Sequence, residues 1–224
     1  MATEARHRGI QLIVVLLVGI VLGILGGFLL DVGDDAEDDT SSPSSPQVRG
    51  PGPYDELNGV PVGYARTEEG VVAAAANFTL LTAKDSLLDP DALVLAMETL
   101  AAPSWKADAQ MQARNGYKFI TDRYGNDADV SGAVLGYDVA DFSNDHASVK
   151  LWAVSVASGS KRPNVEEVWS ILSVDLEWVD GDWRVTGNES EPGPAPVDLP
   201  GGAPQQSAHN VMEEFDEFEG ALVP

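Results

Sequence analysis

The side chains of this sequence that could transfer protons or bind a metal lie far apart. The sequence has three histidines. His7 precedes a long apolar run, His146 lies in a predicted turn, and His209 lies near the C-terminus. Histidine is the side chain best suited to acid–base chemistry and metal binding near neutral pH. No two of these three are placed to meet as ligands or as a proton relay. We therefore expect no metal site and no cofactor.

Carboxylates on predicted strands offer another route to acid–base chemistry. Asp138 and Asp175 could each face a cavity and transfer a proton, and the alternative is that both are solvated on the sheet surface. The sequence has no phosphate-binding glycine loop, no serine nucleophile elbow and no calcium-loop spacing. It also has no cysteine, which excludes disulfides and thiol chemistry. These patterns favour a protein that has no catalytic residues and is not an enzyme.

Charge limits the partners that the chain could bind. Its 224 residues include 36 acidic and 13 basic side chains, which give a formal net charge of −23. Nucleic acids attract clustered Lys and Arg, so we expect no nucleic-acid partner. Residues 54–190 alone hold 22 acidic and 10 basic side chains, so the acidity extends into the predicted domain.

An apolar run predicts a single transmembrane helix over residues 10–30. It reads IQLIVVLLVGIVLGILGGFLL, and Gln11 is its only polar side chain. At about 1.5 Å per residue, such a helix matches a hydrocarbon core of about 30 Å. Arg6 and Arg8 precede the run, which favours a cytoplasmic N-terminus (residues 1–9), a place in the cell membrane and a C-terminal domain outside the bilayer. A cleaved signal peptide is the alternative.

Three glycines in that run, Gly19, Gly23 and Gly27, are spaced four residues apart. On a helix they would form one smooth stripe that a second helix could approach closely. This stripe is the candidate membrane-helix interface. Glycine is frequent in membrane helices in any case, so homo-oligomer formation stays open.

Composition divides the rest of the chain into a tether, a domain and a tail. Residues 31–53 are acidic and then rich in Ser, Pro and Gly, which predicts a flexible tether. Residues 54–190 are of a usual size for one domain. Residues 191–224 are again rich in Pro and Gly and contain no Lys or Arg.

The tail contains a candidate docking motif, Val211, Phe215 and Phe218. Asn210 is suited to cap a short helix on which these apolar side chains would line one face among acidic neighbours. An acidic amphipathic segment on a flexible arm suits a basic groove with an apolar floor. A tail that is disordered or packed on its own domain is the alternative.

The first half of the domain predicts helices. Thr67 is suited to cap the first helix, Asp89 and Pro90 begin a second, and Ser104 begins a third that Gly125 ends. The apolar positions of the third helix recur at helical spacing and are Trp105, Ala109, Ala113, Tyr117, Ile120 and Tyr124.

The second half of the domain predicts four antiparallel strands in a meander. Residues 143–146 form the first turn, residues 159–163 a longer loop, and residues 180–181 a two-residue turn. Helices followed by such strands indicate an α+β domain with the helices packed on one face of the sheet.

The stretch LEWVDGDWRV sets the register of the last hairpin. Its Asp-Gly turn pairs Trp178 with Trp183 and Glu177 with Arg184. We expect the tryptophans to pack together on the face that meets the helices, and the charged pair to form an exposed ion pair on the other face. Tryptophans that line a cleft are the alternative. The fold-defining residues of this hairpin are Trp178, Asp180, Gly181 and Trp183.

Helices followed by a four-stranded meander that ends in LEWVDGDWRV resemble the cone-shaped domain of the nuclear transport factor 2-like (cystatin-like) superfamily, over roughly Glu68 to Glu189. With one membrane helix and an acidic tether, the chain resembles bitopic proteins that serve as scaffolds in type IV secretion and conjugative transfer. The stretch NGVPVGYARTEEGVVAAAANF, Asn58 to Phe78, is similar to proteins of actinobacterial conjugative elements.

This resemblance implies a non-enzymatic scaffold or accessory subunit that is anchored in the lipid bilayer and contacts other subunits outside it. Some relatives of the fold, such as ketosteroid isomerase, are enzymes, so a small-ligand-binding or isomerase-like domain that uses the cone cavity is one alternative. An accessory protein of an envelope lipid-transport system is another, because those systems also pair one membrane helix with a similar domain.

Overall fold

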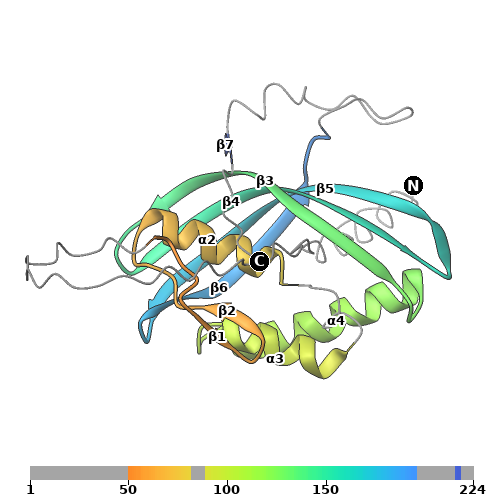
Figure 1. Cartoon of the computed structure of the whole chain (residues 1–224), viewed down its shortest axis with the longest axis horizontal. Coiled ribbons are helices and arrows are strands. Elements are labelled where there is room, and N and C mark those ends of the chain that lie inside the picture. Colours follow the sequence, from red (N-terminus) through yellow and green to blue (C-terminus); the bar gives the residue numbers. More distant parts are fainter. Residues whose placement is uncertain (1–49, 82–88, 196–214, 218–224) are drawn as a thin grey trace, which may run out of the picture.

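The computed structural model describes residues 50–81, 89–195 and 215–217, and these residues form the α+β arrangement that the sequence predicts (Figure 1). The elements are β1 (Asp55–Leu57), β2 (Val60–Val62), α2 (Glu68–Thr79), α3 (Pro90–Leu100), α4 (Lys106–Tyr124), β3 (Asp129–Phe142), β4 (His146–Gly159), β5 (Arg162–Val179), β6 (Asp182–Pro192) and β7 (Asp216–Glu217). Strands β3 to β6 form the antiparallel meander, and β7 extends it to the order β6-β5-β4-β3-β7. The sheet is curved, and α2, α3 and α4 lie on one side of it.

Several predicted segments lie outside the described residues. These are the transmembrane helix at residues 10–30 with its glycine stripe, the tether up to residue 49, and Val211 and Phe218 of the tail. Among the described helices, none is both long enough and apolar enough to cross a membrane.

Local capping signals place the first two helices where the sequence predicts them. The Thr67 hydroxyl accepts a hydrogen bond from the Gly70 N–H at 3.1 Å, and α2 follows with residues buried around most of its circumference. Asp89 accepts hydrogen bonds from the N–H groups of Asp91 and Ala92 at 2.9 and 3.1 Å, and Pro90 occupies the first turn of α3.

Helix α4 begins two residues later than predicted. It begins at Lys106 instead of Ser104, and Trp105, the residue before it, provides no side-chain cap. Gly125 ends the helix with φ +109°, which a residue with a Cβ atom rarely adopts. The predicted apolar stripe faces the core, with Ala109, Ala113, Ile120 and Tyr124 buried and Trp105 and Tyr117 half-buried.

The last hairpin has the predicted register. Trp178 pairs with Trp183, and Asp180 and Gly181 form the turn with φ +53° and +84°. The two indole rings are 5.3 Å apart at 76°, an edge-to-face pair. Trp183 is 2% exposed, and its Nε1–H donates to the Ala65 carbonyl at 2.9 Å. These tryptophans therefore close the core against the start of α2, as expected for the face that meets the helices.

The predicted loop at residues 159–163 is wrong. Gly159 pairs with Arg162, so β4 and β5 run on to a tight turn at Ser160 and Lys161. The reason is a tertiary contact, because this turn packs on the end of α4. The Lys161 N–H donates to the Tyr124 carbonyl at 2.9 Å, and a Cβ atom at Gly159 would lie 2.4 Å from the same oxygen.

An ion cluster joins the same turn to α4. The Glu166 carboxylate accepts hydrogen bonds from Tyr124 at 2.8 Å, from Arg123 at 2.7 Å and from Arg162 at 2.6 Å. Partial burial raises the pKa of Glu166, but the three donors outweigh it and lower that pKa to about 2.

The outer face of the sheet, away from the helices, is partly covered by the chain that follows β6. Trp152 is 4% exposed, packs 5.3 Å from Trp169 and donates from Nε1 to the Pro194 carbonyl at 3.0 Å. The Gly193 N–H donates to the Trp169 carbonyl at 2.9 Å. Ordered contacts of the domain therefore continue to this segment, beyond residue 190.

Both outer strands of the sheet have a covered stretch. The Ala102 N–H, just after α3, donates to the Val185 carbonyl on β6 at 2.8 Å. On β3, Gly136 and Tyr137 pair with β7. The helical turn predicted for the tail is therefore wrong at Asp216–Glu217, because pairing with β3 favours an extended conformation there.

Candidate functional site

A short hairpin that the sequence analysis did not predict builds one wall of the candidate site. β1 and β2 pair through Leu57 and Val60, and Asn58 and Gly59 form the turn with φ +56° and +77°. Asn-Gly between two extended segments is a strong hairpin signal, so the sequence did contain this information. The Asn58 amide donates to the Thr99 hydroxyl at 3.0 Å, which fixes the tip of the hairpin on α3.

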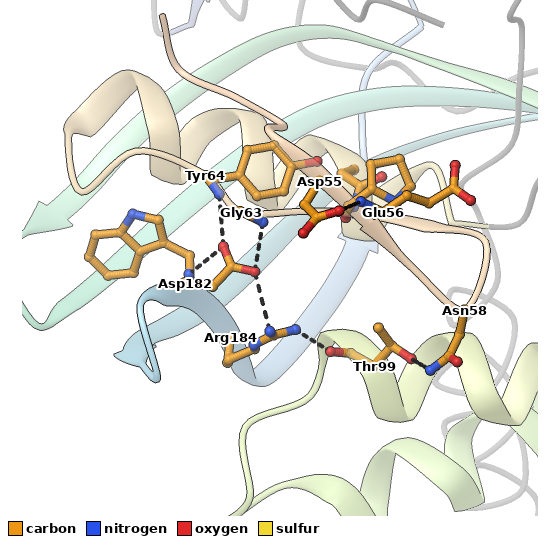
Figure 2. A network of polar contacts seen from close by, with 11 residues as sticks. Asp55, Glu56, Asn58, Gly63, Tyr64, Thr99, Asp182 and Arg184 are labelled. Carbon is orange, nitrogen blue, oxygen red and sulfur yellow. Dashed lines mark hydrogen bonds and ion pairs between the residues drawn. The ribbon is translucent and has the colours of Figure 1, made fainter. Parts of the chain in front are cut away.

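Asp182 fixes the other end of that hairpin. Its carboxylate accepts hydrogen bonds from the N–H groups of Gly63 at 3.0 Å, Tyr64 at 2.9 Å and Trp183 at 2.9 Å (Figure 2). Asp182 is 4% exposed, so these donors replace the water that a carboxylate would otherwise bind. The sequence analysis did not single out Asp182, because nothing local distinguishes it from Asp180 two residues earlier.

Arg184 completes this network and corrects a prediction. Its guanidinium lies 3.4 Å from the Asp182 carboxylate and donates to the Thr99 carbonyl at the C-terminal end of α3, instead of forming an exposed ion pair with Glu177. The side chain of Arg184 is only 18% exposed. A buried carboxylate and a carbonyl at a helix C-terminus interact more strongly with a cation than a solvated surface carboxylate does.

Tyr64 lies beside this network, and its hydroxyl group is not suited to act as an acid or base. Its side chain is 4% exposed. Burial and then the negative charge of Asp182 raise the pKa of the Tyr64 hydroxyl well above its ordinary value. The hydroxyl therefore stays protonated throughout the physiological range.

An open groove of about 270 Å³ lies next to the network, between the tip of the β1–β2 hairpin, α3 and the β5–β6 turn. Leu57 and Leu95 line it and are 49% and 45% exposed. Glu98, Lys106 and Arg184 add charged groups to the lining. Apolar side chains with charged groups around them are suited to receive an apolar side chain of another protein.

The structure does not bring the predicted acid–base candidates into this groove. Asp138 is half-buried and registered with Lys150, and Asp175 is exposed and registered with Gly187. His146 is exposed at the start of β4. Within the described part of the chain, no group of three or more His, Asp or Glu side chains could hold a metal ion.

The fold-defining hairpin contributes to the site indirectly. Trp178 and Trp183 pack on each other, while Asp180 in the turn lines the groove. Of the tail motif, Phe215 precedes β7 and is half-buried beside Gly136. The groove residues Leu57 and Leu95 were missed, because an exposed leucine carries no signal until its neighbours in space are known.

Comparison with known proteins gives a family match and distant structural likenesses. A family model described as a domain of unknown function (DUF8175) matches residues 31–203. None of the curated proteins matches the sequence. Two solved structures are similar to parts of the chain. One is CagV, a VirB8 homolog of T4SS from Helicobacter pylori strain 26695, with 9% identity and a TM-score of 0.39 over 50% of this chain and 85% of that one. The other is the intermembrane space region of the chloroplast protein ARC6, with 15% identity and a TM-score of 0.38 over 58% of this chain and 97% of that one.

Proposed function

The chain belongs to the family described as a domain of unknown function (DUF8175), and we propose that it is a non-enzymatic, membrane-anchored scaffold or accessory subunit of a larger complex. In this proposal residues 10–30 hold the chain in the cell membrane as a single helix. The domain acts outside the bilayer, has the cone-shaped nuclear transport factor 2-like fold and contacts other subunits of a conjugative-transfer or secretion complex.

The groove between Leu57 and Leu95 is the observation that carries this proposal. Both leucines are nearly half exposed, although a leucine side chain gains about 1.5–3 kcal/mol when it is fully buried. A partner side chain placed between them would bury both. The charged lining would then remain at the edge of the contact, as in protein–protein interfaces with an apolar centre and a polar rim.

The polar network beside the groove supports the same role, because it holds the walls in place before a partner binds. Asn58 is bonded to Thr99, Arg184 is bonded to the end of α3, and Asp182 holds the chain that follows β2. A surface whose walls are already ordered loses little conformational entropy on association.

Site-specific photocrosslinking of the full chain in membranes of its native host tests this proposal. We expect a crosslinker at Leu95 to capture a discrete protein, and a crosslinker at Val165, which is 68% exposed on the distant end of β5, to capture none. Leu57→Asp should reduce the Leu95 crosslink, whereas Val165→Asp should not. A chain that leaves solubilised membranes only as a free monomer, without crosslinks at Leu95, would contradict the proposal.

A further inference from the structure

The groove beside the Asp182 network contains two charged side chains that the domain does not pair. Lys106 at the start of α4 and Asp180 in the β5–β6 turn both line the groove, and both are exposed. Among the residues that the structure describes, neither side chain has a hydrogen bond or an ion pair. This part of the chain therefore offers a partner one unpaired cation and one unpaired anion in the same groove.

The other two charged groups of the lining already have partners. Figure 2 shows the Arg184 guanidinium between the Asp182 carboxylate and the Thr99 carbonyl, and the side chain of Arg184 is only 18% exposed. The Glu98 carboxylate accepts a hydrogen bond from the Gln110 amide on α4. A partner that broke either contact would lose part of what it gained. The two exposed charges are therefore the ones that can select a partner.

Apolar side chains share the groove with these charges. Leu57 and Leu95 are about half exposed, and Val179 and Pro103 add further apolar lining. A cavity of about 150 Å³ holds a benzene ring, so a groove of about 270 Å³ has room for one large apolar side chain. A partner residue that buries such a side chain there brings its neighbours in sequence close to the charged groups of the lining.

The acidic end of the chain does not match this groove. Residues 213–219 contain five acidic residues and no basic one. They could pair with Lys106, but they would bring like charge to Asp180 and to a domain in which acidic side chains outnumber basic ones by 22 to 10 over residues 54–190. Like charges that meet across an interface suppress binding. The occupant must therefore carry a cation as well, which disfavours this segment from the same chain or from a second copy.

We propose that the groove binds a segment of a different protein in which one large apolar residue has both a carboxylate and a Lys or Arg within a few residues of it. The carboxylate pairs with Lys106, and the Lys or Arg pairs with Asp180. This inference rests on the proposed function, because it names the partner chemistry of the same groove. The acidic domain also attracts partners with additional basic residues, whereas the carboxylate is required only beside the apolar residue.

Selection from a displayed library of random peptides tests this proposal on the full chain in detergent. We expect the unmodified chain to enrich peptides that carry a large apolar residue with both charges near it. Lys106→Glu should remove the preference for the carboxylate, and Asp180→Asn should remove the preference for Lys or Arg. A peptide of residues 210–224 should not compete with the enriched peptides, because it supplies only acidic groups.

Two matched variants separate a local contact from general attraction between charges. Lys118→Glu on α4 and Asp129→Asn on β3 make the same charge changes at exposed positions that do not line the groove. For a peptide enriched on the unmodified chain, Lys106→Glu should weaken binding about fivefold or more, and Lys118→Glu less than about twofold. Asp180→Asn should likewise weaken binding more than Asp129→Asn. Replacing the carboxylate of the peptide with Lys should restore binding to the Lys106→Glu chain.

Several results would overturn the proposal. Equal effects of Lys106→Glu and Lys118→Glu would indicate general attraction, and enriched peptides with charges of one sign would remove the requirement for both. Binding that survives Leu95→Asp, or no enrichment at all, would place no such segment in the groove. The photocrosslinking at Leu95 detects a groove partner of any charge. A Leu95 crosslink without this charge selection would therefore overturn the inference and leave the proposed function in place.

Discussion

Asp182 accepts a hydrogen bond from the backbone N–H of Tyr64 at 2.9 Å, although the two residues are 118 positions apart in the sequence. Tyr64 follows the β1–β2 hairpin, and Asp182 opens the last long strand of the meander. This contact therefore joins the beginning of the domain to its end, and it sets one wall of the groove through which we propose that the protein binds its partner.

Replacing Asp182 with Asn should lower the free energy of unfolding by about 2–4 kcal/mol. The amide group has one acceptor oxygen, so it cannot accept hydrogen bonds from all the buried N–H groups that the carboxylate satisfies. The substitution also removes the counter-ion of Arg184. Asp180→Asn is the matched control. It lies in the exposed turn at φ +53°, where Asn is well tolerated, and should change stability little. Urea unfolding followed by tryptophan fluorescence measures both variants, and equal losses would show that the buried network contributes nothing specific.

The two tryptophans of the last hairpin should differ in their contribution to stability. Trp183→Ala removes a side chain that is 2% exposed and bonded to Ala65, and should cost about 3–5 kcal/mol. Trp178 is only half-buried at the margin of the core, so Trp178→Ala should cost about 1–2 kcal/mol, mostly from the lost ring pair and partial burial. Thermal unfolding ranks the variants, and a larger loss at Trp178 would contradict the assignment of Trp183 to the core.

Gly70→Ala should destabilise the domain, although alanine in a helix is normally favoured over glycine by about 1 kcal/mol. The reason is steric, since a Cβ atom at Gly70 would lie 2.0 Å from the Ala65 carbonyl oxygen. We expect a net loss of about 1–3 kcal/mol. Gly187→Ala should be close to neutral, because a Cβ atom there would meet only the Asp175 carboxylate at 3.9 Å, and circular dichroism on heating compares the two. A stabilised Gly70→Ala variant would mean that the chain before α2 can move away.

Glu166 should make stability depend on pH in the acid range. Its pKa is lowered from 4.5 to about 2 in the folded chain, so the folded state favours the ionised carboxylate. The resulting stabilisation is fully present above the unfolded pKa of 4.5 and is lost as the pH falls through about 2. Unfolding of the unmodified chain and of Glu166→Gln should therefore differ most near neutral pH and converge on acidification.

The exposed Glu189 provides the control for that titration. Glu189→Gln removes one exposed carboxylate and so controls for the loss of a surface charge in the same measurement. A difference between the unmodified chain and Glu166→Gln that stays constant from about pH 6 to about pH 3 would show that the donors around Glu166 do not favour its ionised form.

Much of the fold could be predicted because its signals are local. The caps at Thr67 and Asp89 act on N–H groups within three residues, and the Asp180–Gly181 turn fixes the register of the strands that it joins. The groove could not be predicted in this way. Leu57 and Leu95 belong to different elements, and their proximity depends on how the β1–β2 hairpin packs on α3.

The sequence by itself determined the α+β order of the described domain, the ends of its first two helices and the pairing of Trp178 with Trp183, because hydrogen bonding and side-chain alternation over a few residues specify each of them. Only the tertiary structure decided that Asp182 is buried while Asp180 is in an open turn, that Arg184 bonds to the end of α3 and that residues 216–217 form a strand on β3. The physical reason is that burial and charge pairing depend on neighbours in space. Two aspartates in one hairpin acquire different roles only when distant parts of the chain pack against them.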